Sequence, residues 1–137
     1  MIGITTKTIY GIAALYELGS VKRDEVLKIK EIAAKASIPQ NFLEQILLEL
    51  RKQGILISQK GAHGGYRLAK ELKDITLKEV MEILEADAFS QECKTDEPAL
   101  KLFWSDISEN LIKVFDIPLS ELKNYQLKAN KALNYSI

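Results

Sequence analysis

The sequence is poor in cysteine and histidine, on which disulfide-rich proteins, metal sites and many enzyme active sites depend. It holds one cysteine and one histidine in 137 residues, which excludes an intrachain disulfide framework and leaves little material for a metal or Ser-His-Asp site. No apolar run approaches the ~20 residues of a membrane-spanning helix. The first residues also lack the apolar stretch of a signal peptide. We therefore expect a cytoplasmic protein that is not an enzyme and has no membrane partner.

The net charge is zero, but the charges are unevenly distributed along the chain. Residues 1–75 hold 12 Lys and Arg against 8 Asp and Glu, whereas residues 76–137 hold 7 against 11. A basic half joined to an acidic half is compatible with a nucleic-acid partner for the first half. This imbalance is weak evidence by itself, because many domains that never bind DNA carry a similar excess.

Hydrophobic periodicity predicts a mainly α-helical fold. The expected helices cover residues 5–19, 30–38, 38–54, 76–86, 98–116 and 119–133, and a short β-prone run covers 26–29. Pro39 and Gly54 flank the clearest helix, as proline and glycine often do at helix starts and ends. Its apolar face is expected to hold Phe42, Leu43, Ile46, Leu47 and Leu50. With the short helix before it, this helix suits helix-turn-helix geometry.

Three glycines occupy five positions of the segment KGAHGGYRLAK, residues 60–70. A phosphate-binding loop would lead into a helix and close with Gly-Lys-Ser/Thr, whereas a strand-like YRL follows here. Because the β-prone segment 55–60 precedes the glycines, a small β-hairpin is the better prediction. A hairpin directly after a helix-turn-helix is the wing of a winged helix, in which glycines let the backbone approach DNA. A plain surface hairpin is the alternative.

The stretch FLEQILLELRKQGILISQKGAHGGYRLAK resembles the signature of the Rrf-two family of winged-helix transcription regulators. That family includes the iron–sulfur cluster regulator, the nitric-oxide-sensing repressor and the cysteine metabolism repressor of bacteria. Its pattern runs YLEQ, then LRKAGLV, then RGxxGGYxLA. The likeness continues in TTKTIYGIAAL, ITLKEVMEILE, LFWSDI and PLSELKN. The resemblance implies a homodimeric, sequence-specific regulator of transcription, expected to be a repressor, on a partly palindromic operator in double-stranded DNA.

The resemblance also implies three DNA-binding segments. The helix beginning near Pro39 would enter the major groove, and the wing would lie at the minor groove or the phosphate backbone. The base-reading positions would be Pro39, Gln40, Asn41, Phe42, Glu44 and Gln45, and the phosphate contacts at the first helix would be Thr6, Lys7 and Tyr10. The wing would contribute Lys60, His63, Gly64, Gly65 and Arg67.

The chemistry of these side chains fits DNA, although each has a plainer interpretation. Asn and Gln can pair with adenine through two hydrogen bonds, and Glu can accept from cytosine N4. Phe42, however, is more often a core residue, and Glu44 could simply cap or solvate the helix. Lys7 could be an ordinary solvated lysine, and His63 could be merely exposed.

The second half of the chain is expected to form the dimer. In the long helix near 98–116, apolar residues alternate spacings of four and three, the seam pattern of paired helices. This seam consists of Leu100, Trp104, Ile107, Leu111 and Val114. We therefore expect a winged helix-turn-helix DNA-binding domain at 1–75 and a helical dimerisation region at 76–137.

Many members of the resembled family hold an iron–sulfur cluster, but most of its ligands are missing here. Cys93 matches the first of three cysteines in the loop before the long helix. Pro98 and Lys101 stand near the positions of the third cysteine and of a histidine ligand, and Thr8 stands where the nitric-oxide sensor has its aspartate. Since none of these three side chains suits such a cluster, we expect no cofactor and no bound metal. Cys93 is then either a redox switch or an inert residue.

A different kind of function is compatible with the same sequence. The wing and helix could bind a partner protein rather than DNA, as the resemblance to the cysteine metabolism repressor suggests. That repressor also lacks the cluster ligands and takes its signal through a partner.

Overall fold

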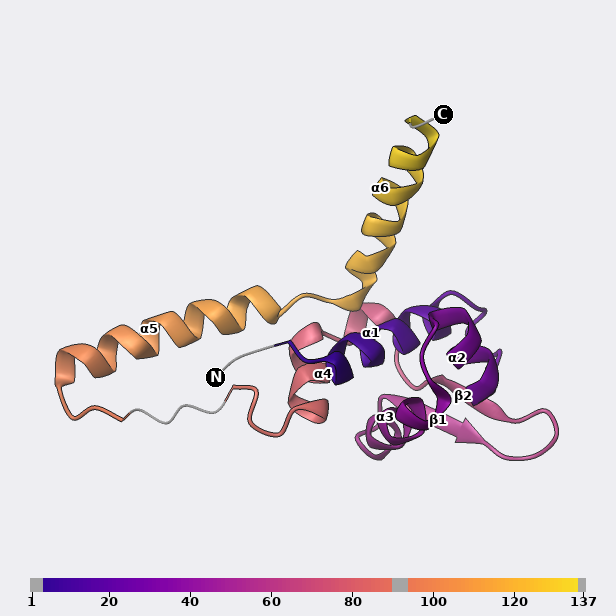
Figure 1. Ribbon diagram of the computed structural model, residues 1–137, viewed down its shortest axis with the longest axis horizontal. Coiled ribbons are helices and arrows are strands. Elements are labelled where there is room, and N and C mark those ends of the chain that lie inside the picture. Colours follow the sequence, from indigo (N-terminus) through magenta and orange to yellow (C-terminus); the bar gives the residue numbers. More distant parts are fainter. Residues whose placement is uncertain (1–3, 90–93, 136–137) are drawn as a thin grey trace.

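The computed structural model describes residues 4–89 and 94–135, and Cys93 lies outside these residues. In chain order, the elements are α1 (Thr6–Gly19), α2 (Ile29–Ala36), α3 (Gln40–Lys52), β1 (Leu56–Gln59), β2 (Gly65–Leu68), η1 (Leu72–Asp74), α4 (Leu77–Leu84), α5 (Pro98–Phe115), η2 (Leu119–Glu121) and α6 (Leu122–Tyr135) (Figure 1). The predicted fold class is confirmed: a mainly α-helical chain carries one small hairpin directly after the paired helices α2 and α3.

Helices α1, α2, α3 and α4 pack around one hydrophobic core. Helix α1 contacts the other three. It approaches α4 closely at Gly11, where an added Cβ would lie 2.5 Å from a methyl group of Leu84. Val80 and Leu84 place α4, which follows residue 75, in the same core as the helix-turn-helix. The functional division at residue 75 therefore stays a prediction, because packing joins α4 to the preceding helices.

The turn between α2 and α3 fixes the direction of α3. Ser37 adopts a left-handed conformation with φ 56°, and the Ile38 N–H donates to the Ala33 carbonyl at 3.0 Å, which closes α2. Ile38 is buried, and Pro39 stands at the N-cap of α3. At the other end, Gly54 has φ 78°. The sequence signals at Pro39 and Gly54 thus mark the observed helix ends.

One residue of the predicted apolar face of α3 does not face the core. Leu43, Ile46, Leu47 and Leu50 are buried, but Phe42 is 57% exposed. The prediction of Phe42 as a core residue is therefore wrong. Its ring instead lies 6.4 Å from that of Tyr10 on α1, because it falls at the edge of the α1–α3 contact.

The wing is an antiparallel hairpin in which Leu56 pairs with Leu68 and Gln59 with Gly65. A third segment joins it through one bridge. The Leu27 N–H donates to the Tyr66 carbonyl at 2.9 Å, and the Tyr66 N–H donates to the Leu27 carbonyl at 2.8 Å. The β-prone run predicted at 26–29 is thus a single bridging residue, and it ties the wing to the segment before α2.

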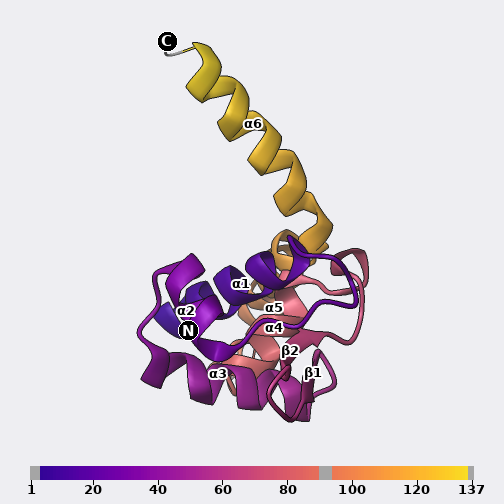
Figure 2. The ribbon, with the colours of Figure 1, turned by 90° about the vertical axis from the view of Figure 1, so that its right-hand side faces the viewer.

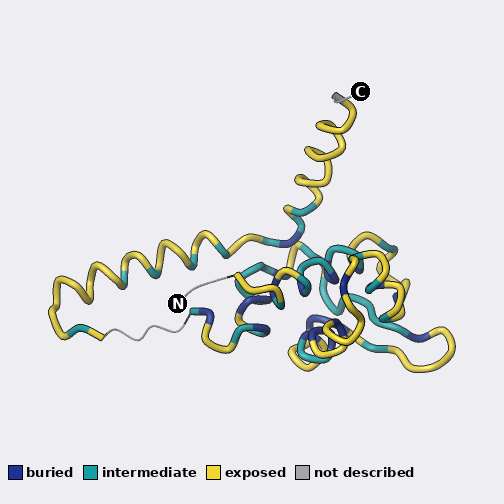
Figure 3. The backbone as a smooth tube through the Cα atoms, viewed as in Figure 1, coloured by how far each residue is buried: buried dark blue, intermediate teal, exposed yellow. Residues whose placement is uncertain are grey.

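Helices α5 and α6 extend away from the body (Figure 1). All 18 residues of α5 are described, and none of them is buried, as its colouring in Figure 3 shows. The chain returns to the body before α6, where the Leu119 N–H donates to the Ile75 carbonyl at 2.8 Å.

Within the described residues, no helix has the length and hydrophobicity needed to cross a membrane.

Candidate nucleic-acid interface

Helix α3 presents a polar face to solvent beside the wing. Because its four buried side chains turn the opposite side toward the core, Gln40, Asn41, Glu44 and Gln45 are all exposed. Figure 2 shows α3 along the lower edge of the body, with the hairpin at the same edge. The structure therefore brings the predicted base-reading positions together on one accessible surface. Pro39 and Phe42 are exposed at the start of the same helix.

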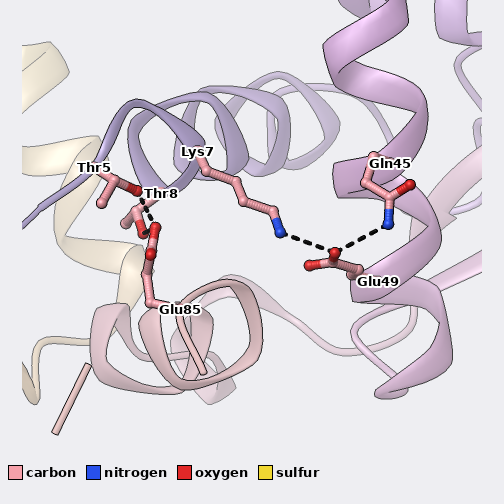
Figure 4. A network of polar contacts seen from close by, with 6 residues as sticks. All are labelled: Thr5, Lys7, Thr8, Gln45, Glu49 and Glu85. Atoms are coloured by element: carbon pink, nitrogen blue, oxygen red, sulfur yellow. Dashed lines mark hydrogen bonds and ion pairs between the residues drawn. The ribbon is translucent and has the colours of Figure 1, made fainter. Parts of the chain in front are cut away.

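The N-terminus of α1 reaches this surface through an ion pair. Lys7 Nζ lies 2.9 Å from Glu49 Oε1, and their side chains are 37% and 25% exposed. Gln45 Nε2 donates to the same oxygen at 3.1 Å (Figure 4). Glu49 thus connects a predicted phosphate contact on α1 with a predicted base contact on α3.

Partial burial tends to raise the pKa of Glu49, but its partners have the larger combined effect. The hydrogen bonds from Lys7 and Gln45 and the positive charges of Lys7 and Lys52 together hold the pKa below its ordinary value. Glu49 is therefore ionised at neutral pH and acts only as an acceptor.

Glu49 was not among the site residues predicted from the sequence. The spacing of four between Gln45 and Glu49 would have suggested their contact on one helix face. The approach of Lys7, 42 positions earlier, depends on how α1 packs against α3, and no local pattern predicts it.

A second carboxylate holds the start of α1. Glu85, which follows α4, accepts hydrogen bonds from the hydroxyl groups of Thr5 and of Thr8, the latter at 3.3 Å (Figure 4). Thr8 is buried. A carboxylate at this position also complements the positive end of the helix dipole. The predicted contacts Thr6 and Tyr10 therefore stand on a helix whose first turn is fixed to α4.

The wing exposes Lys60 and His63 at its tip, while Arg67 is half-buried on β2.

Two glycines of the wing are required by packing within the protein. A Cβ at Gly64 would lie 2.1 Å from the Gln59 carbonyl oxygen, and one at Gly65 would lie 2.5 Å from that of Leu27. Gly61 differs, since no described atom lies within 4 Å of its Cβ position and its φ is +107°. Whether Gly64 and Gly65 also contact DNA stays a prediction.

The predicted dimerisation seam is exposed along α5. Leu100, Trp104, Ile107, Leu111 and Val114 have exposed fractions between 38% and 60%. Phe103 is also exposed, and its ring packs edge-on against Trp104 with centroids 5.0 Å apart. Exposed apolar strips of this kind are typical of interaction surfaces, and dimerisation through this one stays a prediction.

The donor set does not fit an iron–sulfur cluster. Such clusters are held mainly by several cysteine thiolates, and this chain has one cysteine, Cys93. Across residues 4–89 and 94–135, no group of three or more His, Cys, Asp or Glu side chains is placed to hold a metal ion.

A family model described as Rrf2, an iron-dependent transcriptional regulator, matches residues 4–128. The chain is 39% identical over 93 residues to an rrf2-like HTH-type transcriptional regulator of Rhodobacter capsulatus, a match covering 66% of this chain and 62% of that protein. It is 32% identical over 124 residues to the HTH-type transcriptional regulator CymR of Bacillus subtilis, covering 89% of this chain and 90% of CymR. The chain thus spans less than two thirds of the Rhodobacter relative and most of CymR.

Solved structures extend the similarity to the fold. The structure of CymR, the global cysteine regulator of B. subtilis, matches with a TM-score of 0.80 at 31% identity, covering 91% of this chain and 98% of that one. The structure of T. potens IscR matches with a TM-score of 0.75 at 29% identity, covering 93% and 90%. The relatives named here are regulators rather than enzymes, in agreement with the expectation from sequence.

Proposed function

The chain belongs to the Rrf2 family of transcriptional regulators, and on that premise we propose that it binds double-stranded DNA sequence-specifically as a homodimer and represses transcription in the cytoplasm. The observation that carries this proposal is the exposed polar face of α3, which lies beside the wing and the start of α1. A helix with this setting fits the major groove, which displays a distinct pattern of donors and acceptors for each base pair.

Each segment has a distinct part in the proposed complex. Gln40, Asn41, Glu44 and Gln45 read base edges from the first turns of α3. Lys60 and Arg67 place positive charge near the phosphates beside the wing. From α1, Lys7 adds a positive charge, and Thr6 and Tyr10 offer hydroxyl groups that can donate to phosphate oxygens. Phosphate contacts position the protein, whereas base contacts provide the sequence preference. Residues 1–75 carry the DNA contacts in this proposal, and residues 76–137 carry the dimer contacts.

The exposed seam of α5 supports the proposed dimer. Two copies that bury this strip against each other would relate their α3 helices by a two-fold axis. Their half-sites would then lie about one turn of DNA, ~34 Å, apart or a multiple of it. A partly palindromic operator is the expected match to such symmetry. The proposed complex contains no iron–sulfur cluster, because this chain has a single cysteine and such clusters need several thiolate ligands.

Two substitutions separate base readout from phosphate contact. Gln45→Ala should weaken binding to a selected operator by about tenfold or more while changing binding to random DNA little, since a bidentate base contact contributes ~1–3 kcal/mol. Lys60→Ala should weaken binding to both DNAs by a similar factor. Gel shifts with purified protein at one fixed salt concentration measure both ratios.

Equal losses of Gln45→Ala on operator and random DNA would remove the base-reading role from α3. Melting curves of both variants serve as the folding control, because both side chains are exposed and their removal should leave the core intact.

The alternative proposal is a module whose main partner is another protein. The exposed apolar side chains Tyr125, Leu127 and Leu133 on α6 favour it, because they lie outside the α5 seam. Under this alternative, purified protein shifts no upstream DNA unless cell extract is added. A redox sensor that uses Cys93 is a further proposal, and its thiol lies outside the described residues.

A further inference from the structure

The Lys7–Glu49–Gln45 network suggests which base Gln45 prefers, an inference that rests on the proposed function. Glu49 lies one turn after Gln45 on α3, and one carboxylate oxygen accepts from both Lys7 Nζ and Gln45 Nε2, at 2.9 and 3.1 Å. Because the first bond comes from α1, the carboxylate is held from two helices and does not simply follow the motion of Gln45.

An ionised carboxylate restricts the orientation of the amide it contacts. Glu49 can only accept hydrogen bonds, so the NH₂ group of Gln45 must face it. The flipped amide would place two oxygens against each other. Figure 4 shows the Gln45 oxygen turned away from Glu49. The edge left for DNA therefore offers the oxygen as acceptor beside one remaining N–H as donor.

This edge matches one base in the major groove. Adenine presents the N7 acceptor beside the N6 donor, whereas guanine presents two acceptors, N7 and O6. We propose that Glu49 is a positioning residue that fixes the Gln45 amide in the orientation that pairs with adenine. Glu49 acts through Gln45 and does not itself contact the base.

The charge of Glu49 gives a second, opposite effect. A carboxylate near the DNA surface repels phosphates, and its ion pair offsets part of the positive charge of Lys7. Loss of this charge should therefore tighten binding to random DNA and lower the discrimination between bases at the position that Gln45 reads. A residue that only supports the fold would weaken binding to every sequence.

The test is selection of binding sites from a random DNA pool, followed by affinity measurements for the selected site and its single-base variants. Wild-type protein and Gln45→Ala are compared first, and the position whose preference disappears identifies the base read by Gln45. We expect adenine there.

In Glu49→Gln, residue 49 can donate as well as accept, so discrimination between bases at the DNA position read by Gln45 should fall by about tenfold. Binding to random DNA should stay equal or become tighter. Glu49→Ala should do the same.

Glu17→Gln is the matched control, since it removes one carboxylate charge from α1, the helix that carries Lys7, without touching the Gln45–Glu49 bond. It should leave the preference at the Gln45 position unchanged. The inference is overturned if that position is not adenine, if Glu49→Gln keeps full discrimination, or if it loses affinity equally on all sequences. Failure of the wild type to enrich any sequence would instead remove the proposed function, and this inference with it.

Discussion

Glu49 links the stability of the protein to pH through its two hydrogen-bonded partners. Its pKa in the folded protein lies below the ordinary value of 4.5, so the unfolded chain binds the proton more readily than the folded one. The stabilisation from its ionised form is fully present above that ordinary value. It is lost as the pH falls through the lower, folded-state pKa.

We therefore expect the difference in unfolding free energy between the wild type and Glu49→Gln to shrink below about pH 4.5. Urea denaturation at neutral pH and at several acidic pH values measures it. Glu17→Gln is the reference variant, because it removes a carboxylate from α1 that lies outside the Lys7–Glu49–Gln45 network. A difference that stays constant with pH would show that the Lys7–Glu49 pair does not stabilise the fold.

At the scale of elements, the wing depends on its attachment to the segment before α2. Gly65 has φ +156°, and its Cβ position lies 2.5 Å from the Leu27 carbonyl oxygen. Gly65→Ala should push the hairpin away from Leu27, break the two bonds between Leu27 and Tyr66, and destabilise the protein by about 1–3 kcal/mol. Amide hydrogen exchange of Leu27 and Tyr66, together with thermal unfolding, measures the effect.

Gly61→Ala is the control for the wing. It introduces backbone strain at φ +107° but meets no described atom within 4 Å. In Gly61→Ala, the Tyr66 amide should remain protected from hydrogen exchange. Protection of Tyr66 in Gly65→Ala as well would contradict the steric argument.

At the scale of the whole molecule, α5 lies outside the core and is available for pairing with a second copy. Replacing Ile107 by Glu and Leu111 by Lys should yield monomers whose fold is unchanged, because no residue of the fully described α5 is buried within its own chain. Operator binding should fall together with dimerisation, since each half-site is then bound separately. Sedimentation velocity and circular dichroism measure the assembly and the fold.

Lys101→Glu serves as the matched change on α5, because Lys101 is exposed and lies outside the seam. That variant should remain dimeric. A stable dimer of the Ile107/Leu111 variant would place the interface on another surface.

Much of the fold was predictable because its signals are local. The periodicity around Leu43 and Leu47, with Pro39 and Gly54 at the ends, indicated α3 within two residues of its observed bounds. The glycines between two β-prone runs indicated the hairpin. The site was predictable only in part. The exposed polar residues of α3 follow from the position of its apolar face, but Glu49 falls between the YLEQ and LRKAGLV parts of the family pattern, and neither part gave it a role.

The helices, the hairpin and the family could be identified from local sequence patterns, because repeat spacing and turn residues act over short stretches of chain. The contacts of these residues came only from the tertiary structure. It exposed Phe42 beside Tyr10, packed Gly64 against the wing and Gly65 against Leu27, and joined Lys7 to Gln45 through Glu49. These contacts connect segments that are distant along the chain, and they depend on how whole helices and strands pack. No local pattern of side chains contains that information.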